Sequence, residues 1–578
     1  MNSTTASAQS TLQTSTNLPP CATADDTPLL RFSPMPGDVW TSGDANEGCI
    51  VFGRSGGGKS SGAGAAIARA LLRQGRGGIV LIGSSDETDN WLRYAQETGR
   101  SNDIIRFDGS GRYRFNFLEY EMQRSNVPTD VLISNVVAML QSVIETVTRA
   151  TGLSAKASGD AFWEKSTRLL LTQAIDLLYA ATGRVRLPEV LEFINTAPKN
   201  PDQLNDPNWQ KYFFAKTVEK LKTSQIPYPL DREERQRLLN YWLVSFPQMD
   251  DRTRSNMITT LETDFNMLQR GQMRKLFCTA TNLVPEMTFD GKVVLLDFPV
   301  AGDWNETGVM AQMIFKYAWM RSVNRRDKNA PMRPVMNFSD EGQIFLSSFD
   351  AVFQGLCRKN KCATVLLTQN LPTFYSRIGG DDPENTVKSM LGNLKTKIFH
   401  NNDCTTTNDW ATQIIGKETV WRASFDQNTG WNESINEGWN EGQNDGWSDG
   451  ANYSKQMGVN SGSSRSAGYS VSEGSQDSSN FSYGTSMGDN MGHSSGTSTS
   501  ISGGTSRGSS GGSSYGESGG RSAGLREERD YAVEPHEFST QLKMGGKANK
   551  GIVTGVVVLP GRYFERNGKH WMQVAFKQ

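Results

Sequence analysis

The sequence predicts an α/β fold built on a doubly wound, mainly parallel sheet. Short apolar runs with β-branched residues, each bounded by Gly, Asp or Pro, are typical of strands buried on both faces. Helical patterns separate several of these runs, and that alternation favours parallel strands joined by crossover helices. The strand-like runs are residues 49–52, 79–82, 104–107, 293–297, 335–338 and 364–368.

Apolar spacing of about 3.6 residues predicts two helical regions. The first begins at Lys59 and ends at Gly75, because glycine is favoured at a helix C-terminus. The second spans residues 121–280 and is nearly free of strand-like runs. Because strands resume at Val293, we expect this block to be an all-α domain inserted into the α/β domain.

The other domain boundaries follow from composition. We expect the α/β domain to occupy residues 36–120 and 281–426, and residues 525–578 to close it with two further strands. Residues 1–35 are rich in Ser and Thr and are expected to form a disordered tail. A chain of 578 residues is too long for one core, which agrees with several domains.

Residues 427–524 form a Ser/Gly-rich low-complexity segment. They hold 26 Ser, 22 Gly and no Leu, so they lack the side chains of a packed core. Trp431, Trp439 and Trp447 recur every eight residues. One interpretation is a flexible linker. The other is a long β-ribbon or docking arm, in which a period of eight places each Trp on the same face.

Composition also excludes several classes of protein. With 60 basic and 61 acidic residues, the chain cannot bind nucleic acid by bulk positive charge. Six Cys without a CxxC pair, and four His, argue against a disulfide framework and a structural zinc site. The sequence shows neither a secretory signal nor an apolar run of about 18 residues, so we expect no membrane-spanning helix. A reducing, cytoplasmic setting fits these features.

Any DNA contact would therefore need a local basic patch. Few aromatic residues interleave with the candidate cations, so we expect contacts to the nucleic-acid backbone, independent of sequence. The alternative is a solvated charged face without function. The candidates are Arg321, Arg325, Arg326, Lys328, Arg333, Arg358, Lys359 and Lys361.

A nucleotide site is predicted at residues 53–60, GRSGGGKS, which match the Walker A pattern GxxxxGK[ST] between a strand and a helix. Glycines let the backbone bend and point amide N–H groups at phosphate. Lys59 would reach the β- and γ-phosphates of ATP, and the Ser60 hydroxyl would bind Mg²⁺. The alternative is a plain glycine-rich turn. The predicted nucleotide-binding residues are Gly53, Ser55, Gly56, Gly57, Gly58, Lys59, Ser60 and Ser61.

The site also needs a carboxylate from a neighbouring strand, as in a Walker B motif. Asp340 and Glu341 follow a strand-like run, and we prefer them to Asp297, which has no second carboxylate beside it. Asp340 would hold the Mg²⁺ shell, and Glu341 would accept a proton from the attacking water. Without the glycine loop, the pair would be interpreted as a solvated strand end.

Two further residues are candidates for catalysis. Gln369 follows the run at 364–368, at the strand end that faces the ligand in open parallel sheets. It could sense the γ-phosphate or the attacking water. Arg358 precedes that strand, so it would reach a neighbouring subunit's nucleotide more easily than its own, as an arginine finger does. The alternative for Arg358 is a surface charge.

In this order, the motifs resemble those of the type IV secretion coupling proteins, the TraG/TraD-like conjugative DNA-transfer ATPases. The resemblance covers most of residues 36–426 and 525–578. It rests on GRSGGGKS, the helical block, NFSDEGQIF, CRKNKCATVLLTQNLPTFYSRIG, NLKTKIFHNNDCTTTNDWATQIIGKETV and REERDYAVEPHEF. Many relatives have N-terminal membrane helices, which are not seen here. Relatives also tend to carry an Asp-Pro-Lys-like stretch where residues 82–87 are IGSSDE.

The resemblance implies a RecA-like P-loop NTPase that works as a homo-hexamer around a channel for single-stranded DNA. The implied partners are single-stranded DNA, the relaxase of the relaxosome and components of the type IV secretion channel. The implied location is cytoplasmic, peripheral to the inner membrane. The residues that would fill the family's roles are Lys59, Ser60, Asp340, Glu341, Gln369 and Arg358.

Three functions remain open at this point. The first is a DNA-pumping ATPase of conjugation. The second is the ATPase that energises the channel of the same machinery, since Arg358-Lys359 before Thr368-Gln369 also fits that class. The third is a nucleotide-gated cargo adaptor with little turnover. ATP hydrolysis that single-stranded DNA stimulates would separate the first from the other two.

Overall fold

The protein is described by a computed structural model that covers residues 21–124, 127–150, 160–223, 230–378, 382–438, 451–461, 465–472, 491–499 and 510–578. The chain divides into two compact units: the residues up to Glu418 together with Arg529–Gln578, and Thr419–Glu528. The disordered tail expected at 1–35 is wrong for Pro28–Arg31, which form strand β1 and pair with β2 (Val39–Thr41). Residues 1–20 of that prediction lie outside the described residues.

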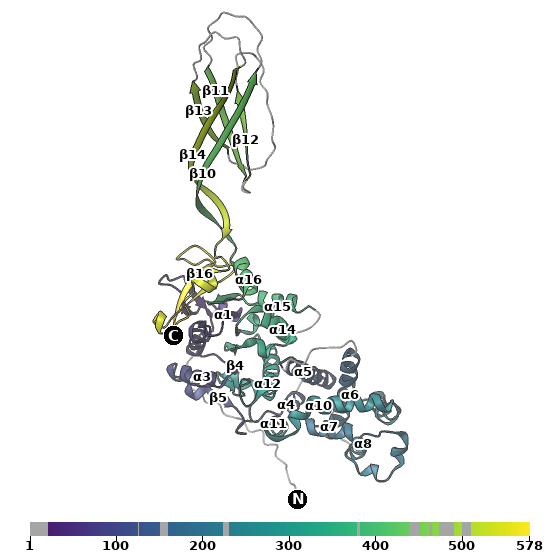
Figure 1. Cartoon of the computed structure of the whole chain (residues 1–578). Coiled ribbons are helices and arrows are strands. Elements are labelled where there is room, and N and C mark those ends of the chain that lie inside the picture. Colours follow the sequence, from purple (N-terminus) through teal and green to yellow (C-terminus); the bar gives the residue numbers. More distant parts are fainter. Residues whose placement is uncertain are drawn as a thin grey trace, which may run out of the picture. The chain divides into compact units, whose positions relative to one another are not determined.

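A nine-stranded sheet organises the first unit, with helices on both faces (Figure 1). The strand order is β16-β15-β9-β3-β8-β7-β4-β6-β5. The strands from β9 to β5 are parallel, as predicted, and β15 and β16 continue the sheet antiparallel at one edge. The bounds are β3 Cys49–Phe52, β4 Gly77–Leu81, β5 Ile104–Phe107, β6 Val293–Leu296, β7 Val335–Ser339, β8 Cys362–Thr368, β9 Thr396–Phe399, β15 Ile552–Val558 and β16 Trp571–Lys577.

Alternate residues of the central strands enter different cores. In β4, Ile79 and Leu81 belong to the core shared with the long helices after β5, whereas Val80 belongs to the core on the opposite face. Successive side chains of a strand point to opposite faces, so a strand covered on both sides needs apolar residues at every position. This explains why the strand-like runs of the sequence are continuous and do not alternate with polar residues.

The helices of the first unit fall into three groups along the chain. The first group is α1 (Ser42–Asn46), α2 (Ala65–Gln74) and α3 (Ser85–Glu97). Between β5 and β6 lie α4 (Phe117–Met122), α5 (Thr129–Ala150), α6 (Asp160–Thr182), α7 (Leu187–Asn195), η3 (Pro201–Asn205), η4 (Trp209–Lys211), α8 (Phe213–Thr223), α9 (Arg232–Asn240), η5 (Tyr241–Ser245), α10 (Asp251–Gln269) and α11 (Gly271–Phe277). After β6 come α12 (Asn305–Asn324), α13 (Ser348–Gln354), α14 (Leu371–Ile378), α15 (Pro383–Gly392), α16 (Thr405–Ile415) and α17 (Glu537–Thr540).

The helical block between β5 and β6 shares one continuous core with the sheet. Phe107 of β5 packs against Phe277 of α11 and Phe315 of α12, with ring centroids 5.5 and 5.8 Å away. Residues Thr129–Thr148 of α5 are long and apolar enough to cross a membrane by composition alone, but 56% of that window is buried inside the protein. Because α5 packs against α6 and α12, its apolar character is explained by the core.

The strands of the second unit form two sheets among the described residues. Of the two interpretations of residues 427–524, these strands favour the β-ribbon over the flexible linker. Trp431 lies in β10, and Trp439 and Trp447 lie outside the described residues. In one sheet β10 (Lys417–Gly438) pairs with β14 (Ser510–Tyr531), and in the other β11 (Ala451–Ser461) lies between β12 (Arg465–Ser472) and β13 (Met491–Thr499), antiparallel to both.

The chain leaves the first unit and re-enters it at one place. The backbone N–H of Ala532 donates to the carbonyl oxygen of Gly416 at 3.1 Å. The ammonium of Lys417 lies 4.9 Å from the centroid of the Tyr531 ring. The two segments that flank the second unit are therefore held side by side.

Phe107 provides a test of this shared core. We expect Phe107→Ala to lower the free energy of unfolding by about 3–5 kcal/mol, because the cavity would open between the sheet and two helices. Urea denaturation followed by circular dichroism measures this change. Leu92→Ala is the control, since Leu92 is exposed, and should change stability by less than about 0.5 kcal/mol. Equal stability of the two variants would contradict the shared core.

Candidate nucleotide-hydrolysis site

The parallel arrangement of three adjacent strands gathers the predicted residues at one edge of the sheet. β8 lies between β3 and β7 and pairs in parallel with both. The segments that follow the C-terminal ends of these strands therefore meet. They are the loop at 53–60 after β3, Gln369 after β8 and the Asp340–Glu341 pair after β7.

The loop at 53–60 requires glycine at several positions. Gly56 and Gly58 have φ angles of 72° and 88°, in the left-handed region that glycine adopts without strain. A Cβ atom on Gly57 would lie 2.9 Å from two backbone carbonyl oxygens. Within the described residues, the amide N–H groups of Gly56, Gly58 and Lys59 make no hydrogen bond. The loop thus presents unused donors that suit an anion such as phosphate.

The serines of the predicted site differ in their surroundings. Ser60 begins a five-residue π-helical turn, η1 (Ser60–Gly64), that leads directly into α2. Ser61 accepts a hydrogen bond from the Gln578 side-chain amide at 2.7 Å. Ser55 is exposed in the loop. Of the three, Ser60 is the one that lies beside the acidic pair.

Residues 400–403, directly after β9, support the loop, and sequence reasoning missed them. The carbonyl oxygen of Asn401 accepts a hydrogen bond from the Arg54 N–H at 3.0 Å. The Asn402 side-chain amide donates to the carbonyl oxygen of Gln369 at 2.9 Å. One short segment thus positions both the loop and Gln369. The sequence HNND lies within one of the stretches that carry the family resemblance, but no spacing rule connects it to the loop.

A buried ion pair joins the loop to the acidic pair. Lys59 Nζ lies 3.0 Å from Glu341 Oε1, and the Lys59 side chain is about 10% exposed. Burial alone would lower the pKa of Lys59, but Asp340 and Glu341 outweigh burial and raise it. Burial would raise the pKa of Glu341, but Lys59 and hydrogen bonds outweigh burial and lower it. Both groups are therefore charged at neutral pH.

Asp340 hydrogen-bonds the Ser60 hydroxyl across the same edge. Burial raises the pKa of Asp340, with Lys59 and Ser60 acting in the opposite direction. A carboxylate and a hydroxyl are hard oxygen ligands of the kind that Mg²⁺ binds. These two residues therefore fit the predicted Mg²⁺ ligands.

Two glutamine amides hold Glu341. Gln343 Nε2 donates to Glu341 Oε2 at 2.5 Å, and the Gln369 side chain hydrogen-bonds the same carboxylate. Glu341 has a φ of 54°, a left-handed conformation that costs energy for a residue with a side chain. Such strain is found where the surrounding structure fixes a residue for function. Gln369 directly follows β8, as predicted, and its side chain is in contact with Glu341; its catalytic role stays a prediction.

Glu87 is a third carboxylate that sequence reasoning did not find. Its carboxylate accepts hydrogen bonds from the N–H groups of Gly83 and Ser84, both at 3.1 Å, and completes a capping box at the start of α3. Burial, and then the charge of Asp340, raise its pKa well above the ordinary value. Its sequence signal was the capping-box spacing from Ser84 to Glu87. Glu87 lines a cavity of about 450 Å³ with Ser60, Asp340 and Glu341.

Asp297, the alternative to the acidic pair, is engaged elsewhere. Its Oδ1 accepts a hydrogen bond from the Thr88 hydroxyl at 2.7 Å, and its other oxygen pairs with Arg106. Among the described residues, it makes no hydrogen bond or ion pair with the loop at 53–60. The geometry therefore agrees with the preference for Asp340 and Glu341.

Arg358 does not reach the loop of its own subunit. It begins the short turn η8 (Arg358–Asn360) before β8, at the sheet edge opposite the loop at 53–60. Its side chain is 73% exposed and lies 2.9 Å from Glu47. Only a second copy of the chain could place this cation at a nucleotide, so its role as an arginine finger stays a prediction.

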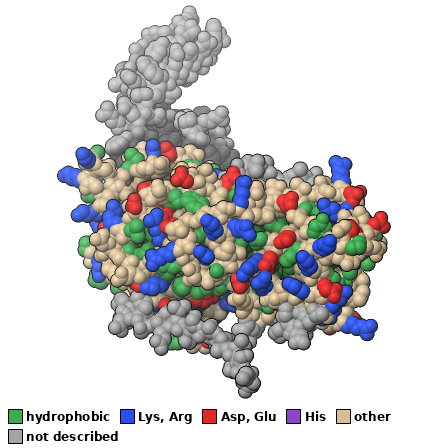
Figure 2. Space-filling view, turned by 90° about the horizontal axis from the view of Figure 1, so that it is seen from below, with side chains coloured by type: hydrophobic (Ala, Val, Ile, Leu, Met, Phe, Trp, Pro, Cys, Tyr) green, Lys and Arg blue, Asp and Glu red, His purple; other side chains and the backbone are tan. Residues whose placement is uncertain are grey.

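Several cations of the candidate DNA patch serve the fold itself. Arg325 makes two hydrogen bonds to the buried carboxylate of Glu121, at 2.8 and 3.1 Å. Arg333 donates to the carbonyl oxygen of Gly75, and Lys361 to that of Thr23. Figure 2 shows basic and acidic side chains interspersed over the face in view. These contacts give Arg325, Arg333 and Lys361 a role in the fold, which is neither the DNA contact nor the solvated face expected from the sequence.

Glu87 leads to a pH-dependent prediction for the protein without nucleotide. Because the pKa of folded Glu87 is raised above 4.5, the folded protein keeps a proton that the unfolded chain releases as the pH rises. The stability gained from protonated Glu87 is complete below about pH 4.5. Above that pH, the free energy of unfolding falls by up to about 1.4 kcal/mol per pH unit. Glu87→Gln should remove this loss and still cap α3.

The free energy of unfolding, measured in urea with EDTA between about pH 4.5 and 8, tests this expectation. The stability of Glu87→Gln relative to the parent should increase with pH. Glu192→Gln, at an exposed carboxylate of α7 outside the site, is the control and should run parallel to the parent. A parallel curve for Glu87→Gln would show that Glu87 does not titrate as described.

No protein-family model and no curated protein matches the sequence. The fold is similar to solved structures of the bacterial conjugative coupling protein TrwB. The unbound monoclinic form of TrwBΔN70 is 13% identical, covers 69% of this chain and 79% of its own, and has a TM-score of 0.46. The complex of TrwB with ADP and Mg²⁺ is 14% identical to this chain and has a TM-score of 0.43. The match covers 68% of this chain and 79% of the TrwB chain. The likeness is distant, so the residues of this chain carry the functional conclusions.

Proposed function

We propose that the chain is a P-loop ATPase that acts as a conjugative coupling protein. It would recruit single-stranded DNA with its attached relaxase and pump both to a type IV secretion channel, at the cytoplasmic face of the inner membrane. The single observation that supports ATP hydrolysis is the 3.0 Å ion pair between Lys59 and Glu341, beside Asp340. DNA transport is supported by the motif resemblance described above.

The ion pair suggests how binding prepares the base. Lys59 must leave Glu341 to reach a phosphate, so ATP binding would replace a carboxylate partner with a phosphate partner. Glu341 would then be free to accept a proton from the attacking water. The amides of Gln343 and Gln369 would hold its carboxylate in place during that exchange.

Ser60 and Asp340 would hold Mg²⁺, which would neutralise charge on the phosphate oxygens when bound. The loop amides at Gly56, Gly58 and Lys59 would supply hydrogen bonds to the phosphates. Arg358 of an adjacent copy in a homo-hexamer would supply the last cation. In this proposal each subunit completes the site of its neighbour.

Glu341→Gln tests the chemical role of the acidic pair. We expect this variant to bind ATP but to lower kcat by about 100-fold or more, because it keeps the shape of the side chain and cannot accept a proton. ATP binding by a fluorescent analogue and turnover by phosphate release measure the two effects. Glu97→Gln is the control and should keep parental turnover. Parental turnover in Glu341→Gln would refute hydrolysis at this site.

Mixing two inactive variants tests the trans arrangement. Arg358→Ala and Glu341→Gln should each be inactive alone. When the two variants are mixed, they should recover part of the parental rate, because some interfaces would combine an intact Glu341 with an intact Arg358.

Single-stranded DNA should stimulate turnover of the parent protein, and the rate per subunit should rise with protein concentration. No recovery on mixing would contradict a finger in trans, and no stimulation by DNA would favour the channel ATPase or the adaptor.

A further inference from the structure

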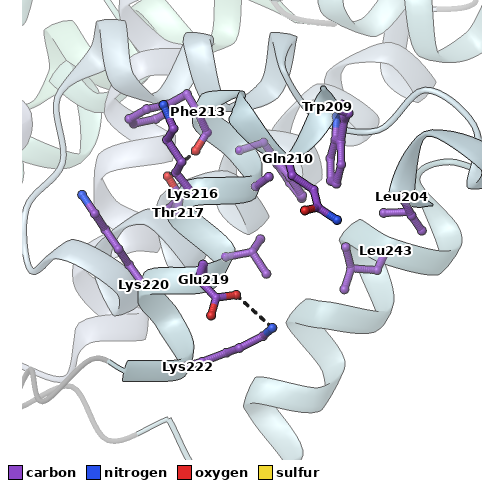
Figure 3. A pocket seen from close by; sticks show the side chains of 13 residues that line it. Leu204, Trp209, Gln210, Phe213, Lys216, Thr217, Glu219, Lys220, Lys222 and Leu243 are labelled. Atoms are coloured by element: carbon purple, nitrogen blue, oxygen red, sulfur yellow. Dashed lines mark hydrogen bonds and ion pairs between the residues drawn. The ribbon is translucent and has the colours of Figure 1, made fainter. Parts of the chain in front are cut away.

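The helical block carries a groove of about 670 Å³, away from the nucleotide site. Its walls come from α8, η3, η4 and η5, as Figure 3 shows. This volume falls within the range of about 300–1,000 Å³ that is typical of binding sites. The groove uses no residue of the loop at 53–60 or of the acidic pair, so a separate role is possible.

The floor of the groove is apolar, and a hydrogen bond fixes its largest side chain. Leu204, Phe213 and Leu243 line it and are half-buried. Trp209 is nearly buried, and its indole N–H donates to the carbonyl oxygen of Thr196 at 3.2 Å. Such fixed apolar walls reduce the ordering cost of binding.

Two exposed apolar residues are next in sequence to residues of the groove lining. Tyr212 is 54% exposed and Val244 is 47% exposed, and each is adjacent in sequence to a lining residue. Both are among the few large hydrophobic residues that the described chain leaves exposed. Val244 lies in η5, a π-helical turn, and such turns are frequent at functional sites. Exposed apolar surface around a groove is typical of a protein-binding site.

Lysines of α8 border this apolar floor on one side. Lys216, Lys220 and Lys222 come from α8 and are exposed. Glu219 is the single acidic residue of the lining, and it lies 3.0 Å from Lys222 (Figure 3). Within the described residues, Lys216 has no ion pair or side-chain hydrogen bond. The rim is therefore positively charged and would attract an acidic partner.

We propose that this groove docks an amphipathic helix of a partner protein, with apolar anchors toward the floor and acidic residues toward the lysine rim. Helices bind grooves of this kind through apolar residues spaced at i, i+3, i+4 and i+7. Rim lysines would steer the helix and fix its orientation. The proposal goes beyond nucleotide hydrolysis and does not depend on it.

The alternative occupant of a basic, aromatic groove is single-stranded nucleic acid, which the geometry disfavours. Bases need exposed ring faces for stacking. The rings of Trp209 and Phe214 are almost fully buried, which leaves the half-buried Phe213 and the neighbouring Tyr212 as the rings with exposed surface. Glu219 would also repel phosphates from the rim.

The test uses the full chain without nucleotide and three fluorescent probes. The first is an 18-residue amphipathic helix with Leu anchors and a Glu-rich polar face. The second has the same anchors and Lys in place of Glu, and the third is a single-stranded oligo-dT of similar size. Fluorescence anisotropy measures binding to the parent and to Lys216→Glu/Lys220→Glu. The matched control, Lys199→Glu/Lys275→Glu, reverses two exposed lysines outside the groove lining.

We expect the acidic helix to bind the parent and to bind the Lys216→Glu/Lys220→Glu variant about tenfold more weakly at low salt. The control should bind like the parent, and the basic helix should prefer the charge-reversed variant. Leu243→Ala should weaken binding of the acidic helix, and the variant should still prefer the acidic helix to the basic one. Failure of the acidic helix to bind the parent would overturn the proposal. Binding of oligo-dT that the same two lysines control would assign the groove to nucleic acid instead.

Discussion

The nucleotide site depends on one constraint, the parallel pairing of β8 with both β3 and β7. This pairing places Lys59 and Glu341, 282 residues apart in the chain, at a 3.0 Å contact. The side chains of Lys59 and Glu341 are only 10% and 25% exposed, so removing either partner would leave a poorly solvated charge. A shift of one strand would separate them and leave two uncompensated charges. The register of the sheet and the charge balance of the site therefore stabilise each other.

The surrounding elements keep this charge cluster in place. Residues 400–403 hold the glycine loop and Gln369, while Gln343 and Gln369 hold Glu341. β15 presses on the loop from the other side, since a Cβ atom on Gly58 would lie 2.5 Å from the Val553 side chain. Strands from both ends of the chain thus contribute to one site, which explains why the closing segment belongs to the same compact unit.

Much of this could be predicted from sequence because the signals are local. Continuous apolar runs located β3 to β8, and loop spacing located Lys59 and Ser60. β9 was missed because only two of its four residues, Ile398 and Phe399, are apolar, too few to give a strand-like run. Glu87 was missed because a glutamate at this position is already explained by the capping box at the start of α3, so nothing in the sequence points to the site. The support of Asn401 for the loop depends on strand order, which the sequence pattern does not contain.

The joining of Gly416 to Ala532 has a consequence for how this protein can evolve. The ends of an inserted segment that leaves and returns at one point are held together whatever the length of the segment. Each doubling of that length raises the entropic cost of loop closure by only about 0.6 kcal/mol. Thr419–Glu528 could therefore expand, contract or be exchanged as a cassette without changing the register of any strand in the sheet. The first and second units would be free to diverge at different rates.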